Sequence, residues 1–194
     1  NHLIYISSDA VYSDSSDGIK EIADKNTSNL YSRMHLDREN IIKVFCEENK
    51  VDFTILRPTA VYGPGDTHNS YGPNKFIREI NAGKNIVLFG KGEECRDHIF
   101  ILDLVKIISE IINKKILGTY TVATGKTCSF NQLAKLICNI KEVPYSRIDY
   151  QLRSGPIPDN INRSFDISNL KLNVLDLKFT DMKDGIKETI NKIS

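Results

Sequence analysis

Hydrophobic residues follow two patterns along the chain, short continuous apolar runs and longer segments with a helical repeat. Short apolar runs bounded by turn residues are typical of buried strands in a parallel sheet. They predict strands at residues 3–8, 51–58, 86–90, 119–124 and 148–152. Helical repeats predict helices near residues 74–82, 103–113, 129–140 and 181–193, and a longer helix over 28–49.

The long helix over residues 28–49 is expected to be amphipathic. Its apolar positions are Leu30, Met34, Ile41, Ile42, Phe45 and Cys46. Its other face is expected to carry Asp37, Arg38, Glu39 and Lys43. Because one predicted strand precedes this helix and another follows it, the segment favours a right-handed parallel crossover and an α/β fold.

A glycine- and proline-rich segment, YGPGDTHNSYGP at residues 62–73, follows the second predicted strand. In open α/β sheets, ligands bind outside the carboxyl ends of the strands. We therefore expect a ligand site beside this segment.

Composition narrows the class of protein. The 26 basic and 25 acidic residues nearly cancel, so no overall field attracts nucleic acid or an anionic membrane. The four cysteines form no C-x-x-C pair, which favours reduced thiols and indicates no metal site. No apolar run approaches the about 20 residues of a membrane helix, so a cytoplasmic protein is predicted. Because an apolar strand begins almost at Asn1, we expect an upstream portion.

Two polar pairs are candidates for catalysis. Ser8 can hold a substrate hydroxyl, and Asp9 can exchange a proton, although both residues can equally be turn residues that satisfy backbone groups. Tyr31 and His35 lie at i and i+4 and share a helix face. A protonated His35 would stabilise the Tyr31 phenolate, and packing alone is the alternative.

Two arginines are candidates for phosphate binding. Arg96 follows the glycine turn GKGEEC, and Arg153 lies in LRSGPIPD. The fixed fork of a guanidinium group suits phosphate oxygens. A surface ion pair is the alternative interpretation for each arginine.

The order of the motifs resembles one family. The motifs are LIYISSDAVY, YSRMH, LRPTAVYGPG, FIREINAGKNIVLFGKGEECRDHIFILDLV, YTVATG and LRSGPIPDNINRSFDISNL. This set resembles the extended short-chain dehydrogenase/reductases, specifically the NAD-dependent epimerase/dehydratase family that acts on nucleotide sugars. The resemblance implies an α/β fold with a partial Rossmann-like, doubly wound parallel sheet and a smaller C-terminal α/β substrate lobe. It also implies that residues 1–73 belong to the NAD-binding domain and residues 74–194 mainly to the substrate lobe, with the two interleaved.

The resemblance also implies roles for individual residues. Ser8 matches the active-site hydroxyl, and Tyr31 matches the catalytic tyrosine, with Asp9 and His35 beside them. The remaining matches are Pro58 and Thr59 along the nicotinamide, Val87 and Phe89 against the nucleotide base, Arg96 and Arg153 on the diphosphate, and Asn74 at the substrate entrance.

The chain departs from the family pattern at three places. It contains no G-x-G-x-x-G phosphate loop, so weak NAD binding is expected. His35 stands where the family has a lysine that lowers the tyrosine pKa and binds the nicotinamide ribose. Ala10 follows Asp9 where dehydratases of the family have a glutamate, which disfavours dehydration.

The resulting hypothesis is an epimerase or 4-keto-sugar reductase that uses NAD or NADP on a nucleotide sugar. The alternative is a non-catalytic, nucleotide-sugar-binding relative. The resemblance also implies a homodimer through the helix that carries the tyrosine, with residues 30–46 as the candidate face.

Overall fold

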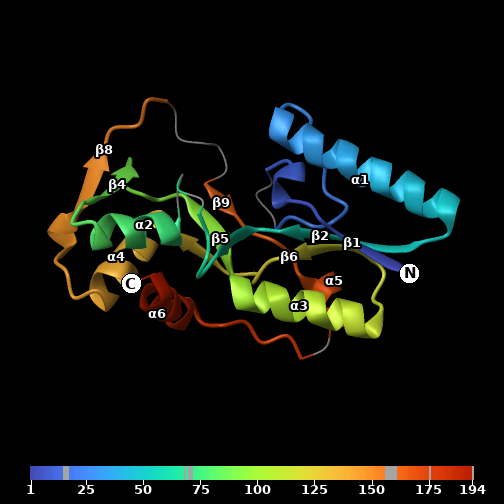
Figure 1. Ribbon diagram of the computed structural model, residues 1–194. Helices are drawn as coiled ribbons and strands as arrows, with labels where there is room; N and C mark the ends of the chain where they lie inside the picture. Colours follow the sequence, from blue (N-terminus) through green and yellow to red (C-terminus); the bar gives the residue numbers. More distant parts are fainter. Residues whose placement is uncertain (15–17, 68, 70–71, 156–160, 175, 194) are drawn as a thin grey trace.

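The computed structural model describes residues 1–14, 18–67, 69, 72–155, 161–174 and 176–193, and it has a mixed α/β architecture (Figure 1). The strands are β1 (His2–Ile6), β2 (Asp52–Pro58), β3 (Ala60–Tyr62), β4 (Ile86–Phe89), β5 (Cys95–Phe100), β6 (Gly118–Val122), β7 (Thr127–Ser129), β8 (Ile148–Gln151) and β9 (Asn162–Arg163). The helices are α1 (Leu30–Asn49), α2 (Pro73–Asn81), α3 (Ile101–Lys114), α4 (Phe130–Ile140), α5 (Ser168–Asn173) and α6 (Met182–Ile193). Two 3-10 helices are η1 (Asp9–Val11) and η2 (Tyr145–Arg147).

The first sheet is parallel, with strand order β1-β2-β6. Figure 1 shows α1 on one side of this sheet and α3 on the other, so the layers alternate as in a doubly wound fold. Buried side chains of α3, such as Ile107, pack against Leu56 of β2 and Val122 of β6. The α/β fold with a parallel sheet is thereby confirmed.

Two smaller sheets lie beyond the first one. β5 pairs with β3, β7 and β9, while β4 and β8 form a parallel pair. A second core, which includes Phe76, Ile86, Leu133 and Ile186, joins β4 to α2, α4 and α6. Strand β6, from the later part of the chain, completes the first sheet, so the chain interleaves between the two cores.

The predicted faces of α1 are only partly right, since Cys46 is buried as expected but other positions are not. Leu30, Ile41 and Phe45 were expected on the apolar face, and they are 81%, 68% and 52% exposed. Glu39 was expected on the polar face, and it is 1% exposed. The apolar repeat misleads here because the sheet-facing side of α1 is polar, and Arg57 of β2 compensates the buried carboxylate.

Several strands were not predicted or are less buried than predicted. β1 was expected to be buried on both faces, but its side chains are half-buried or, at Ile6, 42% exposed, because only β2 flanks it. β5 was missed because it includes Arg96, Asp97 and His98, which break the apolar pattern of a strand. β3, β7 and β9 are two or three residues long, too short for a periodic pattern.

No helix in the described ranges is both long and apolar enough to cross a bilayer. Within those ranges, no group of three metal-ligating side chains occurs, and all four cysteines are free.

Candidate functional site

The turn after β1 is fastened to the start of α1. Ser8 caps η1, where its hydroxyl accepts a hydrogen bond from the Ala10 amide at 3.2 Å. The hydroxyl of Ser32, on α1, donates to the Ala10 carbonyl. The side chain of Asn29 caps α1 by accepting from the Tyr31 amide at 2.8 Å. These contacts bring the Ser8 turn and the Tyr31 helix together.

Tyr31 and His35 stack edge to face, with ring centroids 4.6 Å apart. Tyr31 is 53% exposed, whereas His35 is 8% exposed. Burial lowers the pKa of His35 below its ordinary value, and the nearby Arg38 acts in the same direction. His35 is therefore mostly neutral at pH 7. Its Nδ1 atom is buried and has no hydrogen-bond partner among the described residues.

A buried ion pair lies one helical turn beyond His35. One edge of the Arg57 guanidinium donates to both oxygens of Glu39, with Nε–Oε1 at 2.9 Å and Nη2–Oε2 at 2.6 Å. The Ser7 hydroxyl donates to Glu39 at 2.6 Å, and Arg57 also donates to the Tyr12 hydroxyl at 3.0 Å. Burial alone would raise the pKa of Glu39, but the hydrogen bonds from Arg57 and Ser7 outweigh it and lower that pKa. We call Ser7, Tyr12, Glu39 and Arg57 the sealed cluster.

Sequence reasoning missed the sealed cluster. Glu39 follows Tyr31 by eight residues and His35 by four, so all three share one helix face. That spacing is the signal that could have found Glu39. Through Ser7, which directly precedes Ser8, the cluster joins the helix of Tyr31 to the turn after β1, and so it fixes both candidate catalytic residues relative to each other.

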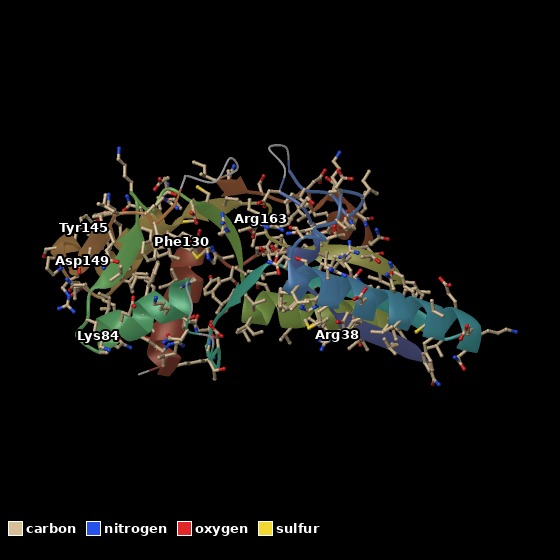
Figure 2. The ribbon with its side chains drawn as sticks, turned by 90° about the horizontal axis from the view of Figure 1, so that it is seen from above. Arg38, Lys84, Phe130, Tyr145, Asp149 and Arg163 are labelled. Atoms are coloured by element: carbon tan, nitrogen blue, oxygen red, sulfur yellow. The ribbon has the colours of Figure 1, made fainter. Side chains whose placement is uncertain are left out.

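Asp9 is paired with an arginine from the far end of the chain. The Arg163 Nε atom lies 3.1 Å from the Asp9 carboxylate, and its Nη2 atom donates to the Asp9 carbonyl at 2.7 Å. Burial raises the pKa of Asp9, while Arg163 opposes the shift. Arg163 sits opposite Arg96 in the register of β9 and β5. In Figure 2, Arg163 lies between Phe130 and Arg38, that is, between α4 and α1.

A pocket of about 600 Å³ opens beyond Arg96. It contains four of the predicted substrate residues, Val87, Phe89, Arg96 and Arg153. The other lining residues are Lys75, Phe76, Leu88, Gly92, Glu94, Phe130, Ser154 and Gly155. The structure therefore gathers residues from β4, β5 and the segment after β8 around one cavity.

The carboxylates beside the pocket pair with its arginines. Arg153 Nη1 lies 2.5 Å from Glu94 Oε1, and Arg153 Nη2 lies 3.4 Å from Glu93 Oε2. Arg96 Nη2 lies 3.6 Å from Glu94 Oε2. We call Glu93, Glu94, Arg96 and Arg153 the open cluster, because their side chains are between 16% and 29% exposed.

Other predicted residues lie away from this pocket. Asn74 is 1% exposed, and its amide group bonds the Gly63 amide at 3.1 Å and the Gly63 carbonyl at 2.7 Å. It does not line the pocket. In the glycine-rich segment expected beside the ligand, His68, Ser70 and Tyr71 lie outside the described residues.

The residues predicted to lie along the nicotinamide are at the end of β2. Pro58 is buried, and the Thr59 hydroxyl donates to the Asp97 carbonyl at 2.9 Å. The Thr59 hydroxyl is therefore already engaged within the protein, and the Nδ1 atom of His35 is buried. The chain contains no G-x-G-x-x-G loop of the kind that binds the pyrophosphate of NAD.

Similar proteins match this chain over most of its length. A dTDP-D-glucose 4,6-dehydratase of Homo sapiens is 31% identical over 142 residues, which are 72% of this chain and 40% of that protein. An uncharacterised UDP-glucose epimerase of Bacillus subtilis is 24% identical over 98% of this chain and 60% of its own length. This chain thus spans less than two thirds of the curated relatives that it matches.

A solved structure agrees with these relatives. The UDP-N-acetylglucosamine 4-epimerase of Methanobrevibacter ruminantium, in complex with UDP-N-acetylmuramic acid, has a TM-score of 0.86 and 26% identity, over 99% of this chain and 62% of that one. The model of the NAD dependent epimerase/dehydratase family matches residues 1–123, a range that holds the Ser8 turn, the Tyr31 helix and Arg96. By this match over more than half of its length, the chain belongs to the NAD-dependent epimerase/dehydratase family.

Proposed function

We propose that this chain carries the catalytic and substrate-binding parts of a nucleotide-sugar epimerase or 4-keto-sugar reductase that uses NAD. One observation carries the proposal. Val87, Phe89, Arg96 and Arg153, which match the family's base and diphosphate positions, line a single pocket although 66 residues separate the first from the last.

The pocket has the chemistry that a nucleoside diphosphate needs. Val87 and the 57%-exposed Phe89 offer apolar area for a base at one side. Arg96 and Arg153 offer guanidinium groups that suit phosphate oxygens. The sugar would then extend past Arg96 toward Arg163 and Asp9, and on to the Ser8 turn.

The catalytic roles fall to the residues at the start of α1. Tyr31 would take the proton of a sugar hydroxyl, and Ser8 would hold that hydroxyl in place. Bound NAD would supply the hydride chemistry at the same carbon. His35, whose ring stacks edge to face on Tyr31, would favour the phenolate form of Tyr31 when protonated.

The residue after Asp9 favours epimerisation or ketone reduction over dehydration. Expelling water from the sugar needs an acid and a base side by side, and Ala10 offers neither. Asp9 itself is held by Arg163, so it is positioned rather than free to swing. The proposal therefore assigns Asp9 to substrate positioning.

Calorimetric titration with UDP-glucose, UDP-N-acetylglucosamine and dTDP-glucose tests the pocket. We expect at least one of them to bind, and the Arg153→Ala variant to lose that binding. Absence of binding by all three would contradict the proposed substrate class.

A second measurement tests the chemistry. A gene product that contains this chain, incubated with NAD and the bound nucleotide sugar, should interconvert sugar epimers or reduce a 4-keto sugar. Tyr31→Phe should abolish this turnover without weakening nucleotide binding. Binding without turnover in the unchanged protein would instead support a binding-only relative.

A further inference from the structure

The two arginines of the pocket already hold an anion, and it is a side chain of the protein. Glu94 reaches Arg153 with Oε1 and Arg96 with Oε2, so one carboxylate bridges both guanidinium groups. Its side chain is 20% exposed, and it lines the pocket. A phosphate that binds these arginines has to take the place of this carboxylate.

The neighbouring Glu93 is held differently. Its carboxylate accepts a hydrogen bond from the Lys91 amide at 2.8 Å, within the turn between Gly90 and Gly92. Both glycines have positive φ, and a Cβ at Gly90 would lie 2.7 Å from Arg153 Nε. Glu93 is therefore part of the turn that packs on Arg153, and it contacts only that arginine, at 3.4 Å.

Glu94 can leave the arginines without disturbing the backbone. Its carbonyl accepts a hydrogen bond from the Phe130 amide at 3.1 Å, which anchors the main chain at the start of α4. The next residue, Cys95, begins β5 and is paired with β7 and β9. Only the side chain has to move, and because the ion pair is partly exposed at the pocket, an incoming phosphate can replace it.

We propose that Glu94 is a specificity-determining residue, an internal counter-anion that phosphate-bearing ligands must displace from Arg96 and Arg153. It lowers the affinity of the pocket for charged ligands and leaves the affinity for neutral ones unchanged. The pocket thereby retains only ligands whose base and sugar contacts add to the phosphate contacts. This inference rests on the proposed function, because it concerns the same pocket.

Calorimetric titration of the 194-residue chain tests the inference, with inorganic pyrophosphate, UDP, dTDP and uridine as probes. Glu94→Gln keeps the size of the side chain and removes its charge. Compared with the unchanged chain, we expect this variant to bind pyrophosphate about tenfold more tightly at low salt. The same gain is expected for whichever of UDP and dTDP binds the unchanged chain more tightly, and the affinity for uridine should not change. Glu93→Gln should tighten binding by only about twofold, because its contact is longer.

A charge control separates the local effect from a change in net charge. Glu110→Gln removes one charge from an exposed pair with Lys114 on α3 and should leave all affinities unchanged. Equal tightening in Glu110→Gln and Glu94→Gln would overturn the inference, as would unchanged pyrophosphate and nucleotide affinity in Glu94→Gln.

The failure of the proposed function would look different. In that case Glu94→Gln would still bind pyrophosphate more tightly than the unchanged chain, but no nucleotide sugar would bind to either protein. If pyrophosphate binds more weakly to Glu94→Gln, the carboxylate does not compete with phosphate and the inference is wrong.

Discussion

The molecule contains two carboxylate–arginine clusters with opposite environments. In the sealed cluster, the side chains of Arg57 and Glu39 are 4% and 1% exposed. In the open cluster, those of Arg153 and Glu94 are 16% and 20% exposed. Both clusters contain a contact near the short end of the hydrogen-bond range, so distance alone does not distinguish them.

The difference lies in what can replace each carboxylate. The Glu39 side chain is buried, so its charge is balanced by Arg57, and the pair helps to hold α1 on the sheet. A ligand in the pocket can reach Arg153 and Arg96, so their pairing with Glu94 can be exchanged. The first cluster therefore supports the geometry of the candidate catalytic residues, and the second is the one that we propose takes part in binding.

The largest expected effect is the loss of stability when the sealed pair is broken. Glu39→Ala leaves the Arg57 guanidinium buried without its counter-charge, which should lower the free energy of unfolding by about 3–5 kcal/mol. Urea denaturation measures this change. Glu94→Ala is the matched control, and we expect it to change stability by less than about 1 kcal/mol. Equal losses in the two variants would contradict the contrast between the clusters.

The next-largest effect is expected at His98, a buried residue outside the sealed cluster that has no counter-charge among the described residues. His98 lies two residues after Arg96, is 3% exposed, and has no hydrogen-bond partner for either ring nitrogen among the described residues. Burial lowers its pKa from the ordinary value of 6.5 to about 4. As the pH falls, the unfolded chain binds a proton at this histidine before the folded chain does. The contribution of His98 to the free energy of unfolding is therefore complete above pH 6.5 and is lost as the pH falls toward 4.

His98→Phe should remove this pH dependence. The unchanged chain is expected to lose about 3 kcal/mol of unfolding free energy across that window through His98, and the variant should lose correspondingly less. Urea denaturation at several pH values gives both curves. His2→Gln, at a half-buried histidine whose ring lies 2.8 Å from the Thr54 hydroxyl, serves as the control for the loss of a histidine elsewhere in the chain. Parallel curves for His98→Phe and the unchanged chain would refute the prediction.

A smaller effect is expected from the open cluster. Arg153→Ala should weaken the binding of a nucleoside diphosphate by about 10- to 100-fold, because a charge-assisted hydrogen bond to phosphate is lost. Stability should change little, since the ion pairs that are lost join partly exposed side chains. Calorimetric titration and thermal unfolding measure the two quantities. A large loss of stability with unchanged affinity would place Arg153 among the structural residues.

The smallest effect is expected at His35, which lies one helical turn before Glu39 of the sealed cluster. His35→Lys places a permanent cation beside Tyr31, and it should speed hydride transfer at pH 7 by about tenfold. In the unchanged protein the rate should fall as the pH rises through the lowered pKa of His35, because the imidazolium is lost. The nicotinamide absorbance, followed against pH, measures both rates. Identical pH profiles for His35→Lys and the unchanged protein would show that His35 supplies no charge to Tyr31.

Sequence patterns predicted most of the regular elements. The helices α2, α3, α4 and α6 begin and end within about two residues of their predicted bounds, because each has an apolar stripe that faces a core. α1 was placed correctly, but its faces were predicted only in part, because the charged Glu39 is buried in a salt bridge. The polar strand β5 was missed for a related reason, since Asp97 and His98 are buried within it.

The sequence by itself determined the family, the parallel α/β order and the identity of the residues that can carry chemistry, because these depend on local patterns and on motifs in order along the chain. Only the tertiary structure decided that Glu39 meets Arg57, that Arg163 meets Asp9, and that Glu94 bridges Arg96 and Arg153. Charges act through space, and partners such as Asp9 and Arg163 are 154 residues apart. No periodicity along the chain encodes such a distance, so the pairing of charges, and with it the division between support and binding, appears only in the folded molecule.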